Sequence, residues 1–171
     1  MTVLINPRSG ATHRRNAVSG LQQLLATQLP WATVEVLEPG SDPTDRTRAA
    51  IATGARVVVA AGGDGTVSAV AQALVGTPVA LGVLPFGTLN HFAQAVGVSR
   101  HLPSAVGQLA ISPVRCVDVG AVNDRFFVNN ASIGLYPELV RLRAQRGATL
   151  AHPFVCLAHS GSLFAWAGRC P

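Results

Sequence analysis

Residues 57–74 read VVVAAGGDGTVSAVAQAL, an apolar run that passes through a glycine-rich turn into a helical pattern. A short apolar run without polar alternation is typical of a strand that is buried on both faces, as in a parallel sheet. Ligands of open α/β sheets bind beyond the carboxyl ends of the strands, where a following helix directs free N–H groups at anions. The run therefore predicts an α/β fold with a phosphate site after this strand.

The same alternation of short strands and helices extends through the first hundred residues. The expected strands are 3–6, 33–37, 56–61 and 79–84, and the expected helices are 14–29, 44–53, 66–74 and 102–109. In the first helix, Val18, Leu21, Leu25 and Leu29 share one face, and Pro30 ends it. This order predicts βαβ units around a parallel sheet.

The pattern changes after Gly97. Strand-like runs at 114–122 and 125–132 are joined by a link that contains Asn123 and Asp124, which predicts an antiparallel hairpin. A helical stretch at 137–145 follows, and the remainder shows neither period clearly. We therefore divide the chain into an α/β domain at 1–112, the start of an antiparallel β domain at 113–146 and an atypical tail at 147–171.

Composition excludes several classes of protein. All 13 basic residues of the 171 are Arg, and Lys is absent. Walker A nucleotide-binding proteins, protein kinases and pyridoxal enzymes each need a Lys and are excluded. We also expect no nucleic-acid partner, because the chain has neither Lys clusters nor an aromatic stacking surface. Arg can still bind phosphates through its planar fork.

Charge and cysteine usage bear on location. Three cysteines without a CxxC pair, and an N-terminus without a signal-peptide pattern, predict a cytoplasmic protein. Residues 148–168 carry no formal charge, but two His, a Pro and two Ser argue against a membrane span. Residues 100–171 hold 7 Arg and 3 acidic residues, which suits either a solvated helix face or peripheral contact with an anionic inner membrane.

The glycine-rich turn itself suggests specific roles. Its three glycines allow close approach of a ligand, and Thr66 can cap the helix or bind a phosphate. Asp64 beside a phosphate suits a magnesium ion held between them, because Mg²⁺ takes one or two carboxylates plus phosphate oxygens. The alternative is that Asp64 is a second capping group in a plain strand-to-helix turn.

Three blocks occur in order: INPRSG at 5–10, GGDGT at 62–66 and LPFGTLNHFA at 84–93. Together they resemble the catalytic domain of the diacylglycerol kinase family, which includes sphingosine, ceramide and bacterial lipid kinases, over roughly residues 1–136. GGDGT alone is shared with NAD kinases and is related to the phosphofructokinase motif. The resemblance implies a three-layer open sheet of the NAD kinase/diacylglycerol kinase type, an ATP-binding domain at 1–112 and the start of a lipid-kinase β domain at 113–146.

The resemblance implies an ATP and Mg²⁺ site at the ends of successive strands. The residues that it assigns to the nucleotide are Asn6, Pro7, Arg8, Ser9, Gly10, Thr44, Gly62, Gly63, Asp64, Gly65, Thr66, Val67, Ser68, Thr88 and Asn90. It implies a catalytic role for Asp64 and metal-linked roles for Asp64 and Asp118, although Asp118 also suits a plain turn. His91 stands where many members have an Asp, and imidazole suits Mg²⁺ poorly.

The implied function is an ATP-dependent lipid kinase that transfers the γ-phosphoryl group to a lipid hydroxyl at a membrane surface. Family members are roughly twice as long and carry a late GDGE-like segment with the general base, which this chain of 171 residues does not contain. We therefore expect a fragment, a frameshifted product or a degenerate paralogue, and a homodimer could cover apolar surface that a missing domain exposes. The alternatives are a nucleotide-binding module without catalysis and an NAD kinase.

Overall fold

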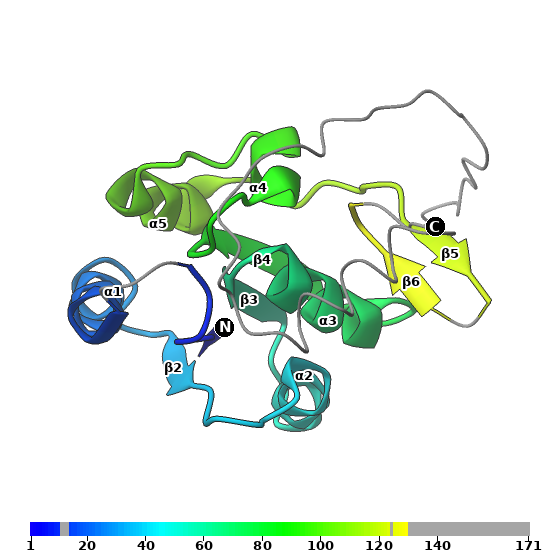
Figure 1. Cartoon of the computed structure of the whole chain (residues 1–171), viewed down its shortest axis with the longest axis horizontal. Helices are drawn as coiled ribbons and strands as arrows, with labels where there is room; N and C mark the ends of the chain where they lie inside the picture. The colour runs from blue at the N-terminus through cyan, green and yellow to red at the C-terminus, as the bar shows by residue number, and fades with distance from the viewer. Residues whose placement is uncertain (11–13, 124, 130–171) are drawn as a thin grey trace, which may run out of the picture.

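The computed structural model describes residues 1–10, 14–123 and 125–129, and four parallel strands form its main sheet (Figure 1). The strands are β1 (Thr2–Ile5), β2 (Thr33–Val36), β3 (Val57–Gly62) and β4 (Ala80–Pro85). Their order is β2-β1-β3-β4, so β1 pairs with β2 on one side and with β3 on the other. The chain moves outward in opposite directions from β1 and β3. Their adjacent carboxyl ends therefore form the topological switch point at which open α/β sheets bind ligands.

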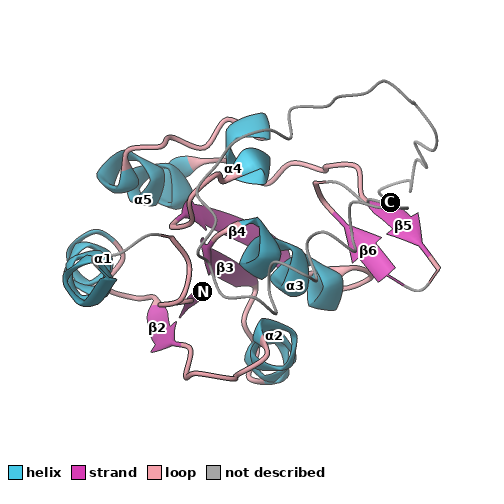
Figure 2. Cartoon of the chain, in the orientation of Figure 1, coloured by secondary structure: helices cyan, strands magenta, loops and turns pink. Residues whose placement is uncertain are grey.

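Helices cover both faces of this sheet and give three layers (Figure 2). They are α1 (Arg14–Gln28), α2 (Pro43–Ala52), α3 (Asp64–Leu74), α4 (His91–Ala95) and α5 (Leu102–Ile111). Buried residues of α1 and α5 pack on one face, and those of α2, α3 and α4 pack on the other. The predicted α/β fold class is confirmed.

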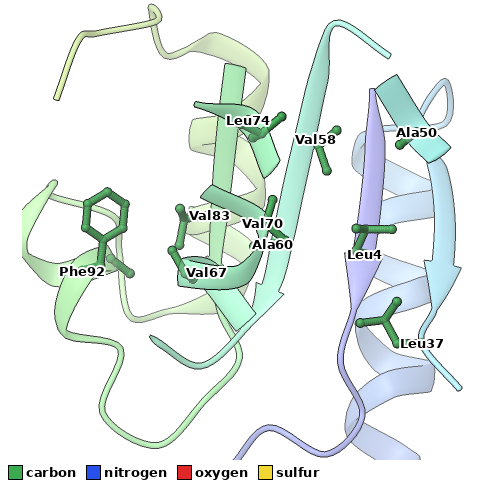
Figure 3. Packing of buried hydrophobic residues seen from close by; sticks show 11 residues of the cluster. Leu4, Leu37, Ala50, Val58, Ala60, Val67, Val70, Leu74, Val83 and Phe92 are labelled. Carbon is green, nitrogen blue, oxygen red and sulfur yellow. The ribbon is translucent and has the colours of Figure 1, made fainter. Parts of the chain in front are cut away.

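The core follows the period-two pattern of the strands. Val3 and Ile5 of β1 pack with α1 and α5, whereas Leu4 points to the opposite face. Figure 3 shows that second face, where Leu4 and Val58 of the strands lie among side chains from the covering helices. Because β1, β3 and β4 are largely apolar on both faces, this part of the sheet is buried between two helical layers, whereas β2 at the edge carries Thr33 and Glu35.

Eight of the predicted elements agree with the structure to within two residues at each end. One reason is local capping: the Asp42 carboxylate accepts a hydrogen bond from Thr44 N at 2.8 Å and starts α2. This backbone hydrogen bond also lowers the pKa of the Asp42 carboxyl. The short helix α4 was not predicted.

The predicted hairpin is confirmed but is much shorter than expected. Strands β5 (Gly120–Val122) and β6 (Arg125–Phe127) pair antiparallel, and Asn123 takes a left-handed φ of 53° in the turn. Residues 114–119, predicted as strand, form no ladder and are largely exposed. An isolated β-pattern gains little without a partner strand or a covering layer. The predicted helix at 137–145, the end of the second predicted strand and the tail lie outside the described residues.

No helix within the described ranges is long and apolar enough to cross a bilayer. The boundaries proposed at 112 and 146 stay predictions, since nothing in the described part of the chain tests them.

Candidate functional site at the carboxyl edge of the sheet

Three loops meet at the carboxyl ends of β1, β3 and β4. Asn6 N donates to the Ala61 carbonyl oxygen at 2.9 Å, and Phe86 N donates to the Gly62 carbonyl oxygen at 3.1 Å. A Cβ atom on Gly10 would lie 3.2 Å from the Phe86 carbonyl oxygen. The first loop, which follows β1, therefore also lies against the third loop, which follows β4. The structure thus brings the three sequence blocks together, as parallel strand ends require.

Glycines make this convergence sterically feasible. A Cβ atom on Gly87 would lie 2.3 Å from Gly63 Cα, which is backbone that cannot rotate away. A Cβ atom on Gly62 would lie 2.5 Å from Thr66 Cβ. The loops after β3 and β4 therefore cross at a contact that only glycine permits.

Thr66 is the polar centre of the junction. Its side chain is 5% exposed, and its Oγ1 accepts a hydrogen bond from Asn6 Nδ2 at 2.9 Å. The Ser9 hydroxyl lies 3.3 Å from the same oxygen. Asn6 Oδ1 accepts from Arg8 N at 2.9 Å, which closes the turn after β1. The first loop is therefore fixed to the start of α3 through side chains.

The amino end of α3 has the features of an anion site. Gly63 precedes the helix and provides no side-chain cap, so the first N–H groups lack the partner that Ser, Thr or Asp would give them. Gly65 is exposed, its φ is not left-handed, and a Cβ atom there would meet nothing within 4 Å. Gly in a helix costs about 0.5–1 kcal/mol relative to Ala, and no protein contact explains it here. Glycine in open space at the start of a helix is typical of sites where a ligand approaches the backbone closely.

Asp64 is turned toward α4. Its Oδ2 accepts from His91 N at 3.2 Å and its Oδ1 accepts from Phe92 N at 3.1 Å. These two N–H groups open α4. The carboxylate thus caps a helix that begins 27 residues further along the chain.

The loop after β4 is closed by Asn90. Asn90 takes a left-handed φ of 54°, its Oδ1 accepts from Gly87 N, and its Nδ2 donates to the Gly87 carbonyl oxygen, both at 2.9 Å. Asn90 was predicted to contact the nucleotide, but both the oxygen and the nitrogen of its side-chain amide form hydrogen bonds within the loop. Thr88 and Leu89 form the exposed apex, and Leu89 is 59% exposed.

Other predicted site residues lie in different surroundings. The Thr44 hydroxyl donates to the Ala69 carbonyl oxygen at 3.4 Å and links α2 to α3. Val67 is 2% exposed and contributes its side chain to the core. Ser68 is half-buried on α3, and Asp118 is exposed in the segment without strands.

The donor set for a metal is sparse. No group of three His, Cys, Asp or Glu side chains that could hold a metal ion occurs within the described ranges. Asp64 is engaged with α4 through both oxygens. These residues do not by themselves form a resident magnesium site, and the metal roles of Asp64 and Asp118 stay predictions.

Sequence reasoning missed Gly87 and the first turn of α4. The glycine in FGTLN was a visible signal, because a glycine just after a strand often marks close backbone approach. A five-residue helix such as α4 has too few positions to show a helical period.

This chain is similar to known proteins in both sequence and fold. A probable lipid kinase YegS-like protein of Pseudomonas aeruginosa is 35% identical over 139 residues, which are 78% of this chain and 43% of that protein. A protein of the same name from Klebsiella pneumoniae is 45% identical over 80 residues, which are 45% of this chain and 27% of that protein. A solved diacylglycerol kinase from Bacillus anthracis superposes with a TM-score of 0.68 at 25% identity, covering 83% of this chain and 50% of that one.

The chain therefore spans half or less of the length of each of these relatives. The sequence model of the diacylglycerol kinase catalytic domain matches residues 1–122. This match favours the lipid kinase interpretation over the NAD kinase alternative. Because it covers well over half of the 171 residues, the chain belongs to the diacylglycerol kinase catalytic domain family.

Proposed function

We propose that this chain is the nucleotide-binding part of an ATP-dependent lipid kinase. The observation that carries the proposal is the uncapped amino end of α3, enclosed by loops from β1 and β4 and containing an exposed Gly65 without a steric reason. Backbone N–H groups at such an end bind phosphate oxygens without side-chain rearrangement.

In the proposed complex, the N–H groups of residues 64–66 hold the phosphates of ATP. Mg²⁺ arrives as part of the substrate, coordinated by phosphate oxygens, which matches the absence of a three-ligand cluster within the described ranges. Arg8, exposed on the first loop, brings positive charge to the same edge. Phosphoryl transfer requires mainly positioning and charge neutralisation, and these groups supply both.

The proposed acceptor is the hydroxyl of a lipid at a membrane surface. The family membership and the names of the relatives support this class of acceptor. The exposed apolar side chain of Leu89 at the loop apex supports contact with an amphiphile. We assign the base that accepts the hydroxyl proton to no residue of this chain.

The first test measures binding of Mg-ATP to the 171-residue chain by calorimetry and by thermal unfolding. Mg-NAD⁺ is the comparison ligand. A ligand at 100 times its Kd stabilises the folded state by about 2.7 kcal/mol. We expect selective stabilisation by Mg-ATP. Unfolding that Mg-ATP does not shift would contradict the nucleotide site.

Gly65→Ala sharpens this test. We expect it to raise the free energy of unfolding by about 0.5–1 kcal/mol, because Ala favours helix, and to weaken Mg-ATP binding about tenfold. The matched control is Gly107→Ala in α5, where the nearest atom lies at an ordinary 3.8 Å; it should stabilise the fold and leave binding unchanged. Equal affinity of both variants for Mg-ATP would contradict close approach at Gly65.

Transfer is then measured as label from γ-labelled ATP appearing in lipid vesicles that contain diacylglycerol or another lipid alcohol. Transfer by the chain would establish the kinase reaction. Mg-ATP binding without transfer would favour the nucleotide-binding module over a complete enzyme.

A further inference from the structure

We infer that Asp64 is a positioning residue, a clamp that fixes α4 and the exposed apex of the preceding loop to the start of α3, rather than a direct ligand of a metal ion. The nucleotide part of this inference rests on the proposed function. The structural part stands on the hydrogen bonds of Asp64 alone.

The first argument is that α4 has no local cap. Asn90 precedes the helix, yet it makes no side-chain cap, because its amide is used on Gly87 in both directions. Its left-handed backbone also differs from the extended conformation typical of an N-cap residue. The carboxylate of Asp64 therefore supplies the cap that the local sequence does not.

The second argument is the geometry of the two bonds. Each carboxylate oxygen accepts one N–H from successive residues, His91 and Phe92, at 3.2 and 3.1 Å. A bidentate cap of this kind fixes both the distance and the direction of α4. A carboxylate that served mainly as a metal ligand would not need both oxygens aligned on consecutive amides.

The third argument is what the clamp holds in place. The loop after β4 is anchored on one side by the Gly87–Gly63 backbone contact and on the other by Asp64. Phe92, 6% exposed, packs with Val67 of α3 in the same core cluster. Both ends of the loop are thus tied to the start of α3, and the position of the exposed loop apex at Thr88 and Leu89 depends on Asp64.

The structural test is amide hydrogen exchange on the nucleotide-free 171-residue chain. In Asp64→Ala we expect the amides of His91 and Phe92 to exchange on the order of tenfold faster, the range expected for loss of a cap. Asp64→Asn should lie between wild type and Asp64→Ala, because its amide oxygen can still accept one of the two bonds.

The matched control is Asp45→Ala. Asp45 is also an acidic residue in the first turn of a helix, α2, but it is exposed and pairs with Arg48. Its loss should leave exchange at α4 unchanged. Unchanged exchange at α4 in both Asp64 variants would overturn the clamp.

The nucleotide test compares ATP affinity with Mg²⁺ and with excess EDTA. A clamp predicts that each Asp64 variant weakens ATP binding by the same factor in both conditions. A loss seen only with Mg²⁺ would identify a direct metal ligand and overturn the inference. If Asp64→Ala does not fold, Asp64→Asn is judged by the same two measurements. If wild type binds no ATP, the proposed function fails, and hydrogen exchange still decides whether the clamp exists.

Discussion

The two ends of α3 are held in very different ways. At the amino end, loops from β1 and β4 reach the helix through a glycine crossing, the Thr66 hydrogen bonds and the Asp64 bonds to α4. At the carboxyl end, the β5–β6 hairpin is attached by a hydrogen bond from Phe126 N to Gln72 Oε1 at 2.7 Å and by partly buried Val128. The hairpin lies beyond α3 in Figure 1.

The difference shows where the fold is specified most strictly. At the amino end, two backbone segments lie so close together that a side chain at Gly87 would clash with Gly63. At the carboxyl end, the hairpin strands are short and largely exposed. The proposed phosphoryl transfer would require precise positioning of its reactants, and the closely fitted contacts lie at the amino end.

The largest expected effect comes from breaking the amino end at Gly87. Gly87→Ala places a Cβ atom 2.3 Å from Gly63 Cα, so the two loops must separate. We expect the free energy of unfolding to fall by about 3 kcal/mol, at the upper end for overpacking, and Mg-ATP binding to be lost. Urea denaturation measures the first effect. Gly20→Ala in α1, where nothing lies within 4 Å, is the control, and equal stability of the two variants would contradict the crossing.

A smaller effect is expected from Thr66→Val, which keeps the shape and removes the hydroxyl. Asn6 Nδ2 and Ser9 Oγ then lose their common partner at a part-buried site. We expect a loss of about 1–2 kcal/mol in unfolding free energy, because a donor is left unsatisfied. Thr27→Val removes an exposed hydroxyl that donates to Gln23 and should cost under about 0.5 kcal/mol. Equal losses of unfolding free energy in the two variants would contradict a stabilising role for the hydrogen bonds of Thr66.

The smallest effect is expected at the carboxyl end. Gln72→Ala removes the acceptor of Phe126 N, which should cost about 0.5–1 kcal/mol and speed hydrogen exchange at that amide. Mg-ATP affinity should stay unchanged. Gln22→Ala, an exposed glutamine of α1, controls for the loss of a helical glutamine side chain. A drop in Mg-ATP affinity in Gln72→Ala alone would show that the two ends of α3 are coupled.

Much of the α/β layer could be predicted because its signals are local. Apolar β-branched runs, helical spacing and stop signals such as Pro30 act within a few residues, and Asp42 caps its own helix through Thr44 two residues away. The meeting of the three blocks at one edge followed from parallel strands alone. The nucleotide contacts expected of these blocks stay predictions.

The predicted strand at 114–122 shows the limit of local signals. Its residues have β propensity, yet only Gly120–Val122 pair, because a strand needs hydrogen-bonding partners that propensity does not provide. Helix α4 shows the converse, since a segment too short to display a period is helical because Asp64 caps it and the core receives Phe92.

The sequence by itself determined the order of strands and helices, the apolar faces that bury the sheet and the placement of glycine-rich turns after the strands. Only the tertiary structure decided which partner each polar group of the site takes. Asp64 meets α4, Asn90 meets Gly87 and Thr44 meets Ala69. The reason is physical: periodicity and propensity act over one or two turns of chain. The partner of a carboxylate depends on how packed layers bring distant segments within hydrogen-bonding distance.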